Sequence, residues 1–197
     1  DGQLGCELKR SQPQGINLIV TDRKTLDITD PLSIENALKM HEPDWLINCA
    51  AYTAVDKAES EQDTATAINA TASGLLAKAC TTTGARMAQI STDFVFDGSQ
   101  STPYLPDDTP NPLSVYGSTK LDGEQAVLKA LPDALIIRTS WLYSSQGQNF
   151  VKSMLKLMQD RDELGIVYDQ VGSPTWAATL ATATWQLITV GASGIHQ

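Results

Sequence analysis

The sequence predicts an α/β protein whose doubly wound parallel sheet is covered by helices on both faces. Apolar runs without polar alternation, which are typical of buried strands, occur at residues 16–22, 45–51, 86–91 and 134–139, with a further extended stretch at 164–168. Helical patterns separate these runs, and buried strands that alternate with helices are typical of a parallel sheet. A chain of 197 residues can bury one substantial core around such a sheet.

Besides a short helix at the N-terminus, described below, helices are predicted at residues 31–41, 61–83, 114–131, 149–160 and 175–190. Asp30 is placed as the N-cap of the first, because its side chain can accept a backbone hydrogen bond, and Pro31 suits the first helical position. Gly84 closes the second helix and Pro132 stops the third. The proline-rich residues 102–112 are predicted to form a loop.

The amino-acid composition argues against several classes of function. A formal net charge of −9 disfavours a nucleic-acid partner, and no apolar run is long enough to cross a bilayer. Cys6, Cys49 and Cys80 are odd in number and lack metal-binding spacing, so we expect reduced thiols in a cytoplasmic protein. Only two histidines are present, which argues against a histidine-rich metal site.

The motif that carries chemistry is Tyr116-Gly-Ser-Thr-Lys120, preceded along the chain by Ser91-Thr92-Asp93. A spacing of four residues puts Tyr116 and Lys120 on one helix face, where the ammonium is expected to lower the pKa of the phenol. With a hydroxyl from Ser91 or Thr92, such a site moves a proton on or off an alcohol or carbonyl during hydride transfer. Taken alone, the spacing is better explained by a surface tyrosine and a solvated lysine than by a catalytic pair. The rest of the sequence therefore has to distinguish the two interpretations.

The first residues resemble the end of a glycine-rich turn, in which Gly2-Gln-Leu-Gly5 enters a helix at residues 6–10. A dinucleotide fold needs a strand before such a turn. We therefore expect a strand just before Asp1, with a further glycine two residues upstream, and we expect these 197 residues alone to be unstable and not to bind dinucleotide. About 20 residues further on, Asp22 could bind the hydroxyls of the adenosine ribose, and Arg23 could bind a 2′-phosphate. The alternative is that the two glycines and Asp22 simply form ordinary turns.

Seven segments together resemble the extended short-chain dehydrogenases/reductases, and among them the dTDP-4-dehydrorhamnose reductases. They follow in order over almost the whole chain, at residues 2–5, 26–29, 48–59, 91–98, 112–124, 138–143 and 169–175. The resemblance implies a Rossmann-like NAD(P)-binding domain over residues 1–145. Over residues 146–197 it implies the final elements of that domain, interleaved with the start of a smaller substrate domain. It places the first strand and most of the substrate domain outside the sequence.

The resemblance also implies roles for individual residues. Cofactor contacts would come from Tyr116, Lys120 and a set in the N-terminal half: Gly2, Gln3, Leu4, Asp22, Arg23, Asp27, Ile28, Ala51, Tyr52 and Thr53. Tyr116 would be the proton donor, while Lys120 would hold the nicotinamide ribose and tune Tyr116. Thr92 would hydrogen-bond the sugar C4 oxygen, with Asp93 and Trp141 beside the sugar.

Simpler roles stay open for several of these residues. Asp93 also suits a turn cap, Trp141 the core, and Ala51 and Thr53 the packing at a strand end. Asn69, inside a helical pattern, either orders the site through a water or is simply exposed.

The implied reaction is the reduction of dTDP-4-dehydro-β-L-rhamnose by hydride from NADPH, the last step of dTDP-L-rhamnose synthesis. NADH is the alternative cofactor, because Asp22 and Arg23 favour opposite choices. A related 4,6-dehydratase is disfavoured, since it needs a titratable residue where Phe94 follows Asp93; C4 epimerases are separated by the resemblance only. The non-enzymatic alternative is a binding subunit similar to the regulatory beta subunit of methionine adenosyltransferase.

Two further properties follow from the resemblance alone. Some family members use Mg²⁺, and Glu7 matches a candidate ligand position, although we favour a solvated helix acid. The oligomeric state is open, with a homodimer as one option.

Overall fold

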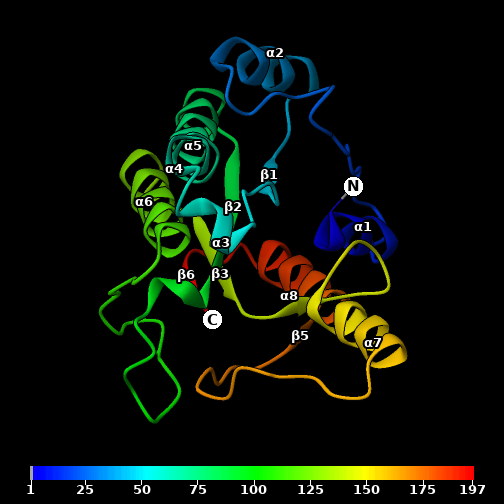
Figure 1. The fold of residues 1–197 in the computed structure, drawn as a ribbon. Helices are drawn as coiled ribbons and strands as arrows, with labels where there is room; N and C mark the ends of the chain where they lie inside the picture. Colours follow the sequence, from blue (N-terminus) through cyan, green and yellow to red (C-terminus); the bar gives the residue numbers. More distant parts are fainter. Residues whose placement is uncertain (1) are drawn as a thin grey trace.

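Four strands form the central sheet, in the order β1-β2-β3-β6 (Figure 1). They are β1 (Trp45–Asn48), β2 (Arg86–Thr92), β3 (Leu135–Thr139) and β6 (Gly194–His196). The computed structural model describes residues 2–197, and each pair of neighbouring strands in this sheet is parallel. The predicted parallel sheet is therefore confirmed.

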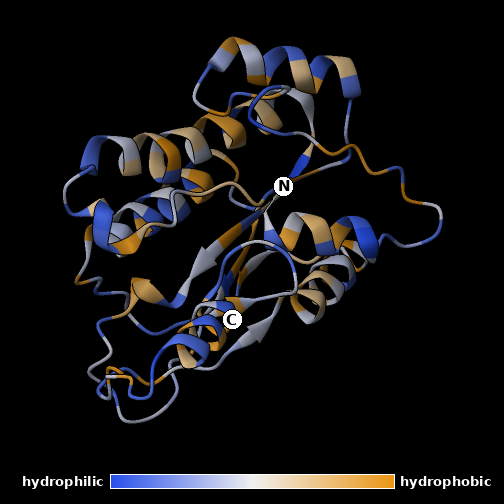
Figure 2. Cartoon of the chain, turned by 45° about the vertical axis from the view of Figure 1, so that its right-hand side comes forward, coloured by the Kyte–Doolittle hydropathy of each residue, from blue (hydrophilic) through white to orange (hydrophobic). Residues whose placement is uncertain are grey.

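Helices cover both faces of the sheet (Figure 1). On one face lie α2 (Pro31–His41), α5 (Ala72–Thr83) and α6 (Val115–Ala130), and on the other lie α1 (Gln3–Arg10) and α8 (Ala177–Thr189). Successive strand residues point to opposite faces, so that Met87 packs with the first group of helices and Ala88 with the second. The helices carry both hydrophobic and hydrophilic stretches, as expected for a layer between sheet and solvent (Figure 2). The doubly wound arrangement is confirmed.

Local signals placed the helix ends correctly. The Asp30 side chain accepts a hydrogen bond of 3.0 Å from the Leu32 amide and so caps α2. The Ser114 hydroxyl accepts one of 3.0 Å from the Gly117 amide and caps α6. Gly84 ends α5 with φ = 76°, a left-handed backbone that glycine adopts without strain.

The long helix predicted over residues 61–83 is present in three consecutive pieces. They are α4 (Gln62–Thr66), a turn of π-helix η1 (Ala67–Thr71) and α5. A π turn widens the backbone and moves the following side chains around the axis, and such turns are frequent at functional sites. Asn69 lies within this turn.

Two predicted strands are absent. Residues 16–22 and 164–168 belong to no strand, because a strand needs a hydrogen-bonded neighbour and none pairs with either segment among residues 2–197. Ile19 and Val20 remain exposed as a result.

The predicted helix at 175–190 also needs a correction. It starts at Ala177, after the two-residue strand β5 (Thr175–Trp176), which pairs with β4 (Leu142–Tyr143). These strands and β6 are too short for a periodic pattern, so the sequence did not predict them.

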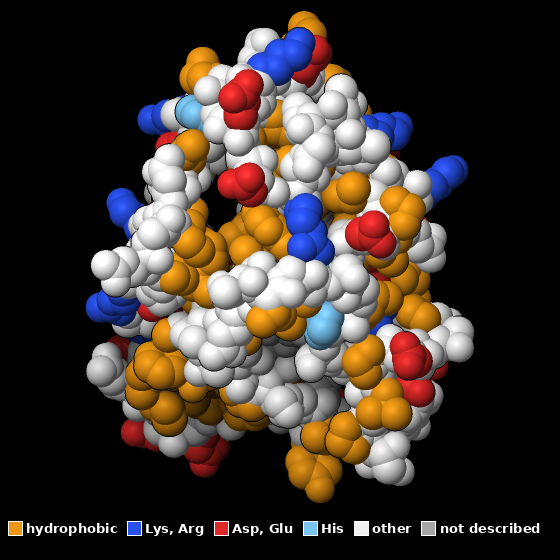
Figure 3. Space-filling view, turned by 180° about the vertical axis from the view of Figure 1, so that it is seen from behind, with side chains coloured by type: hydrophobic (Ala, Val, Ile, Leu, Met, Phe, Trp, Pro, Cys, Tyr) orange, Lys and Arg blue, Asp and Glu red, His pale blue; other side chains and the backbone are white. Residues whose placement is uncertain are grey.

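The remaining helices lie at the rim. They are α3 (Val55–Ala58), the 3₁₀ turn η2 (Asp93–Val95) and α7 (Phe150–Asp160). No residue of α7 is buried, and Phe150, Leu155 and Met158 are exposed. Apolar side chains are also open to solvent on the surface seen from behind (Figure 3). Across residues 2–197, no helix combines the length and apolar character needed to cross a bilayer.

Candidate active site

The first residues of the candidate site, Thr92 and Asp93, lie at the carboxyl end of β2. β2 ends at Thr92, whose hydroxyl accepts a hydrogen bond of 3.2 Å from the Phe94 amide and donates one of 3.1 Å to the Asp93 carboxylate. Thr92 thus caps η2 as well as ending the strand. The carboxyl edge of a parallel sheet is where ligands of such folds bind. The cap of this turn is thus Thr92, whereas Asp93 is the first residue of η2, so the turn-cap alternative for Asp93 is wrong.

Helix α6 brings Tyr116 to this edge. The Tyr116 ring meets the Phe94 ring edge-on, with centroids 5.5 Å apart. The next residue is glycine for a steric reason, since a Cβ on Gly117 would lie 2.2 Å from the Phe94 carbonyl oxygen. The close approach seats the first turn of α6 on η2 and therefore fixes Tyr116 beside Thr92.

The electrostatics of Tyr116 differ from the expectation. Burial raises the pKa of Tyr116 above its ordinary value, and the Asp93 carboxylate adds to this, whereas a hydrogen bond with Thr92 acts in the opposite direction. The net pKa of this phenol is therefore raised and not lowered in the protein alone, because desolvation of the phenolate outweighs the hydrogen bond with Thr92. The effect of Lys120 on Tyr116 stays a prediction. Burial likewise raises the pKa of Asp93.

Lys120 is held below the surface rather than solvated. Its ammonium donates a hydrogen bond of 2.7 Å to the Ile90 carbonyl, and the residue is only 4% exposed. Burial lowers the pKa of Lys120 to about 8, while Glu124 and Cys49 favour its charged form. The interpretation of Lys120 as a solvated surface residue is wrong.

Asn69 is buried, and the interpretation that it is simply exposed is wrong. Its Oδ1 accepts a hydrogen bond of 2.9 Å from the Tyr52 amide, and its Nδ2 donates to the Tyr52 carbonyl at 3.2 Å and to the Thr119 hydroxyl at 3.1 Å. One side chain therefore fastens the segment after β1 to α6. Ala51 is half-buried and Thr53 is exposed, and both follow the end of β1 at Asn48, so packing at the strand end stays an alternative for Ala51 but does not describe Thr53.

Gly2, Gln3 and Leu4 stand at the N-terminus of α1. Gly2 is the N-cap and makes no side-chain hydrogen bond, and within residues 2–197 a Cβ there would meet no atom closer than 4 Å. Gln3 accepts a hydrogen bond of 3.0 Å from the Asn149 side chain and so links α1 to the start of α7. The Leu4 side chain is buried in the core, which leaves only its backbone for a ligand.

The predicted ribose-binding and adenine-binding residues make local hydrogen bonds. Asp22 accepts from the Lys24 and Thr25 amides at 2.9 and 3.0 Å, and these bonds lower its pKa. Asp27 accepts from the Thr29 hydroxyl, which lowers its pKa as well. The turn alternative for Asp22 is therefore realised in the protein alone. Beyond these turns, Ile28 packs against the core and the Arg23 charge stabilises ionised Asp27.

Trp141 is not a core residue, so that alternative is wrong. It is 41% exposed and has φ = 44°, an uncommon backbone for a bulky side chain. Its ring covers Gly172, where a Cβ would lie 2.9 Å from Trp141 Cε2. Such strained residues concentrate at functional sites.

Glu7 is buried, not solvated as favoured from the sequence. It is 4% exposed and lies 3.5 Å from the Arg10 guanidinium. Within the described residues 2–197, no group of three or more metal-binding side chains gathers. The candidate Mg²⁺ ligand thus has a cation, not further carboxylates, beside it.

Sequence reasoning missed a buried polar network under the site, in which Glu124 contacts both Ser91 and Arg138. Glu124 follows Lys120 by four residues, and this spacing on one helix face was the signal that could have found it. Thr139 lies in register with Thr92 on the neighbouring strand, and its hydroxyl is buried with no hydrogen-bond partner among residues 2–197.

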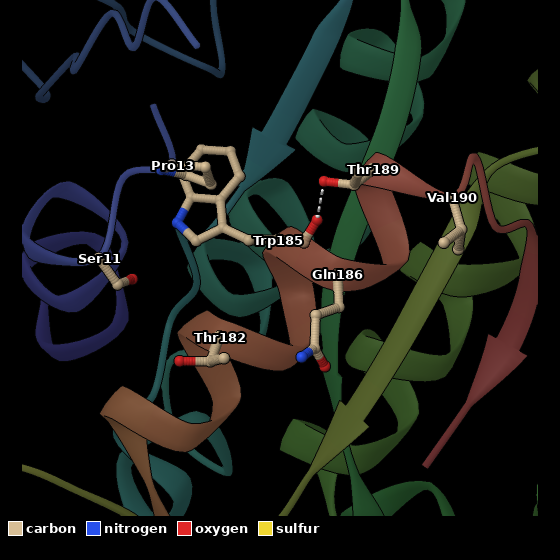
Figure 4. Close-up of a pocket in the computed structure, with 7 residues that line it drawn as sticks. All are labelled: Ser11, Pro13, Thr182, Trp185, Gln186, Thr189 and Val190. Carbon is tan, nitrogen blue, oxygen red and sulfur yellow. Dashed lines mark hydrogen bonds between the residues drawn. The ribbon is translucent and has the colours of Figure 1, made fainter. Parts of the chain in front are cut away.

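A pocket between α1 and α8 is separate from this site (Figure 4). It is lined mainly by apolar surface around Trp185, together with Pro13 and Thr189. Two of its polar groups are already paired, since Trp185 Nε1 donates to the Leu8 carbonyl at 3.2 Å and the Thr189 hydroxyl donates to the Trp185 carbonyl at 2.8 Å.

Comparison with known proteins gives the relatives of this chain. The dTDP-4-dehydrorhamnose reductase of Shigella flexneri is 44% identical over 196 residues, which cover 98% of this chain and 66% of that protein. The protein of the same name from Streptomyces griseus is 45% identical over 196 residues and covers 98% and 64%. The chain thus spans slightly less than two thirds of the length of these curated relatives.

Solved structures agree with the sequence relatives. A dTDP-4-dehydrorhamnose reductase from Clostridium acetobutylicum superposes with a TM-score of 0.95 at 44% identity, over 99% of this chain and 70% of that one. The Bacillus anthracis protein in complex with NADP gives 0.95 at 40% identity with the same coverage. Residues 1–195 match the family described as the RmlD substrate binding domain. The chain therefore belongs to the RmlD substrate binding domain family.

Proposed function

We propose that the protein reduces the C4 ketone of a dTDP-linked deoxysugar, dTDP-4-dehydro-β-L-rhamnose, with hydride from NADPH. The observation that carries the proposal is the convergence of Thr92, Tyr116 and buried Lys120 at the carboxyl edge of β2. The names of the relatives support the substrate, and the NADP complex of the Bacillus anthracis protein supports the cofactor.

The residues present suit a dinucleotide. The N-terminus of α1 would present amide groups and a positive dipole end to a pyrophosphate, and Gly2 has no side chain to obstruct it. Arg23 would donate hydrogen bonds to the 2′-phosphate of NADPH. The segment 51–53, which Asn69 holds through the backbone of Tyr52, would line the cofactor site. At the same edge lies the buried hydroxyl of Thr139, which has no hydrogen-bond partner in the part of the chain that the structure describes.

In the proposed reaction, bound NADPH supplies the hydride that the C4 carbon of the ketone receives. Tyr116 gives its hydroxyl proton to the C4 oxygen, which becomes the alcohol. A raised pKa suits this role, because the phenol is then fully protonated at neutral pH. Thr92 hydrogen-bonds the same oxygen, and Lys120 holds the ribose next to the nicotinamide. Asp93 and Trp141 border the sugar.

The sequence also led to expectations about cellular location, Mg²⁺ and oligomeric state. The three cysteines are free, which supports a cytoplasmic location. Mg²⁺ is not part of the proposal, because Glu7 is paired with Arg10. The homodimer stays a prediction.

The test is NADPH consumption by the intact protein, followed by absorbance, with dTDP-4-dehydro-β-L-rhamnose as substrate. The 4-keto-6-deoxy-D-glucose nucleotide is the second substrate to compare, since a 40% identical Streptomyces niveus relative is named as its reductase. Consumption only with the second ketone would change the substrate assignment. No consumption with either, together with co-purification of another enzyme, would favour the binding-subunit alternative.

Lys120→Met is expected to weaken NADPH binding and to lower turnover, and it should also change how stability depends on pH. The pKa of Lys120 is about 8 in the folded protein against 10.5 for the free side chain, so the unfolded chain binds more protons between these values. This contribution to stability is present in full above pH 10.5 and is lost as the pH falls to about 8. Urea unfolding should show wild type gaining about 3 kcal/mol relative to the variant across this window. A pH-independent difference would contradict the buried position of the ammonium.

Arg23→Ala is expected to weaken NADPH binding more than NADH binding. A hydrogen bond to a charged phosphate is worth about 1.5–3 kcal/mol, so the preference should shift roughly tenfold or more. Fluorescence titration with both cofactors measures it, and Lys24→Ala, which removes the adjacent cation, is the matched control. Equal losses for the two cofactors would take Arg23 out of the phosphate site.

A further inference from the structure

Glu124 and Arg138 form a buried ion pair directly beneath the candidate catalytic residues. Arg138 Nε and Nη2 donate to the two carboxylate oxygens of Glu124 at 3.0 and 2.7 Å, and both side chains are at most 3% exposed. Replacing such a pair by apolar side chains of similar volume is often neutral or stabilising, so net stability does not explain its presence. A two-pronged pair does fix the relative orientation of its two elements, here α6 and β3.

On one side, the pair reaches the catalytic strand. The Ser91 hydroxyl donates to Glu124 Oε1, and Ser91 immediately precedes Thr92. Glu124 also lies one helical turn after Lys120, whose charged form it favours. The carboxylate therefore contacts the strand that carries Thr92 and stands beside the lysine of the same site.

On its other side, the pair reaches the loop that separates Thr92 from Tyr116 in the sequence. Arg138 Nη1 donates to the Pro106 carbonyl at 3.3 Å, and the guanidinium lies over the Phe96 ring at 5.1 Å. Phe96 stacks on Tyr104, with ring centroids 4.3 Å apart. We call residues 97–111 the 97–111 loop.

The base of the 97–111 loop is held by hydrogen bonds of its own to the Asp97 carboxylate. Asp97 accepts hydrogen bonds from the Ser99 amide, the Tyr104 hydroxyl and the Asn111 side chain, at 2.9, 2.8 and 2.9 Å. Leu105 and Asp108, on either side of Pro106, bond to each other instead. The Leu105 amide donates to the Asp108 carboxylate, and the Asp108 amide donates to the Leu105 carbonyl. Arg138 ties this outer part of the loop to β3 through the Pro106 carbonyl, and Gln197, directly after β6, donates to the neighbouring Tyr104 carbonyl at 3.2 Å.

We propose that Glu124 and Arg138 are positioning residues that couple the outer part of the 97–111 loop to the Ser91–Thr92 strand end and to the helix face of Lys120. The outer part of the loop then keeps the position described above only when the strand end and α6 are correctly placed. The catalytic part of this inference rests on the proposed function, whereas the coupling itself is a property of the fold.

The decisive variant is the double replacement E124M/R138M. If the pair has only a structural role, two apolar side chains of similar volume should leave both stability and function close to those of wild type. The positioning role predicts a melting temperature near that of wild type, with kcat lowered roughly 10–100-fold and KM changed less, because catalytic groups lose alignment. An exposed pair provides the matched control, E35Q/K39M on α2, which should leave both values unchanged.

Amide hydrogen exchange supplies a readout that needs no turnover. In E124M/R138M the amides of Leu105 and Asp108 should exchange roughly tenfold faster or more, the factor that one charged hydrogen bond is worth. The Ser99 amide, held by Asp97, should keep its wild-type rate. R138K preserves the charge but not the two-pronged geometry, so it should show the same selective change even if the double variant does not fold.

The outcomes separate this inference from the proposed function. Wild-type kcat together with wild-type exchange at Leu105 and Asp108, in E124M/R138M or in R138K, would overturn the coupling. Uniformly faster exchange that includes Ser99 would also overturn it, because it would indicate general destabilisation. If wild type reduced neither ketone, the proposed function would fail while the exchange rates still decided the coupling.

Discussion

Replacing Tyr116 by phenylalanine in the intact protein should lower turnover by roughly 10²–10⁴-fold with little change in NADPH affinity. The substitution removes the only proposed proton donor and keeps the ring that packs edge-on against Phe94. Fold and cofactor binding should therefore survive, and the loss should fall on kcat. Stopped-flow measurement of NADPH oxidation, with the Kd for NADPH measured separately, distinguishes the two effects.

The pH profile provides a second check on Tyr116. Because burial raises the pKa of this phenol, the donor stays protonated through neutral pH, and wild-type turnover should lose that donor only as the pH rises above the ordinary tyrosine range. The matched control is Tyr168→Phe, which removes a hydroxyl from a residue that is 97% exposed. Near wild-type kcat in Tyr116→Phe would show that another group donates the proton.

Gly123→Ala should be among the most destabilising single-methyl changes in the chain. A Cβ at this position would lie 2.2 Å from the carbonyl oxygen of Asn69, a backbone atom of the π turn that cannot rotate away. Overpacking costs about 1–3 kcal/mol even where side chains can adjust, so we expect a loss of at least about 3 kcal/mol in the free energy of unfolding. Urea denaturation measures this loss.

Gly5→Ala is the matched control for Gly123→Ala. Both glycines are helical, but a Cβ at Gly5 would meet no atom within 4 Å. Alanine there should stabilise the protein by roughly 0.5–1 kcal/mol, since it restricts the unfolded chain and favours the helix. Equal effects of the two substitutions would mean that α6 does not press on the π turn as closely as described.

The parts of the fold that local chemistry determines could be predicted from the sequence. The caps at Asp30 and Ser114 and the stop at Gly84 depend on a few neighbouring residues, and each lies at or next to the predicted helix end. Residues 16–22 show the opposite case. Their apolar, β-branched pattern is that of a strand, yet strand formation depends on a partner elsewhere in the chain.

The candidate site divides in the same way. A four-residue spacing sufficed to place Tyr116 and Lys120 on one helix, but the direction of the Tyr116 pKa depends on how deeply α6 is seated. Gly117 determines that seating through its contact with the Phe94 carbonyl, which no periodic pattern reveals. The exposed, left-handed Trp141 and the π turn around Asn69 are equally products of tertiary packing.

The amide of Asn69 does for Tyr52 what a neighbouring strand does for a strand residue. It satisfies both the N–H and the C=O of Tyr52, and it also bonds Thr119 on α6. The segment after β1 therefore takes its rigidity from two helices instead of from the sheet. In thermal motion we expect Tyr52 and α6 to move as a single body, so that a cofactor lying across 51–53 would follow the helix of Tyr116 through every fluctuation.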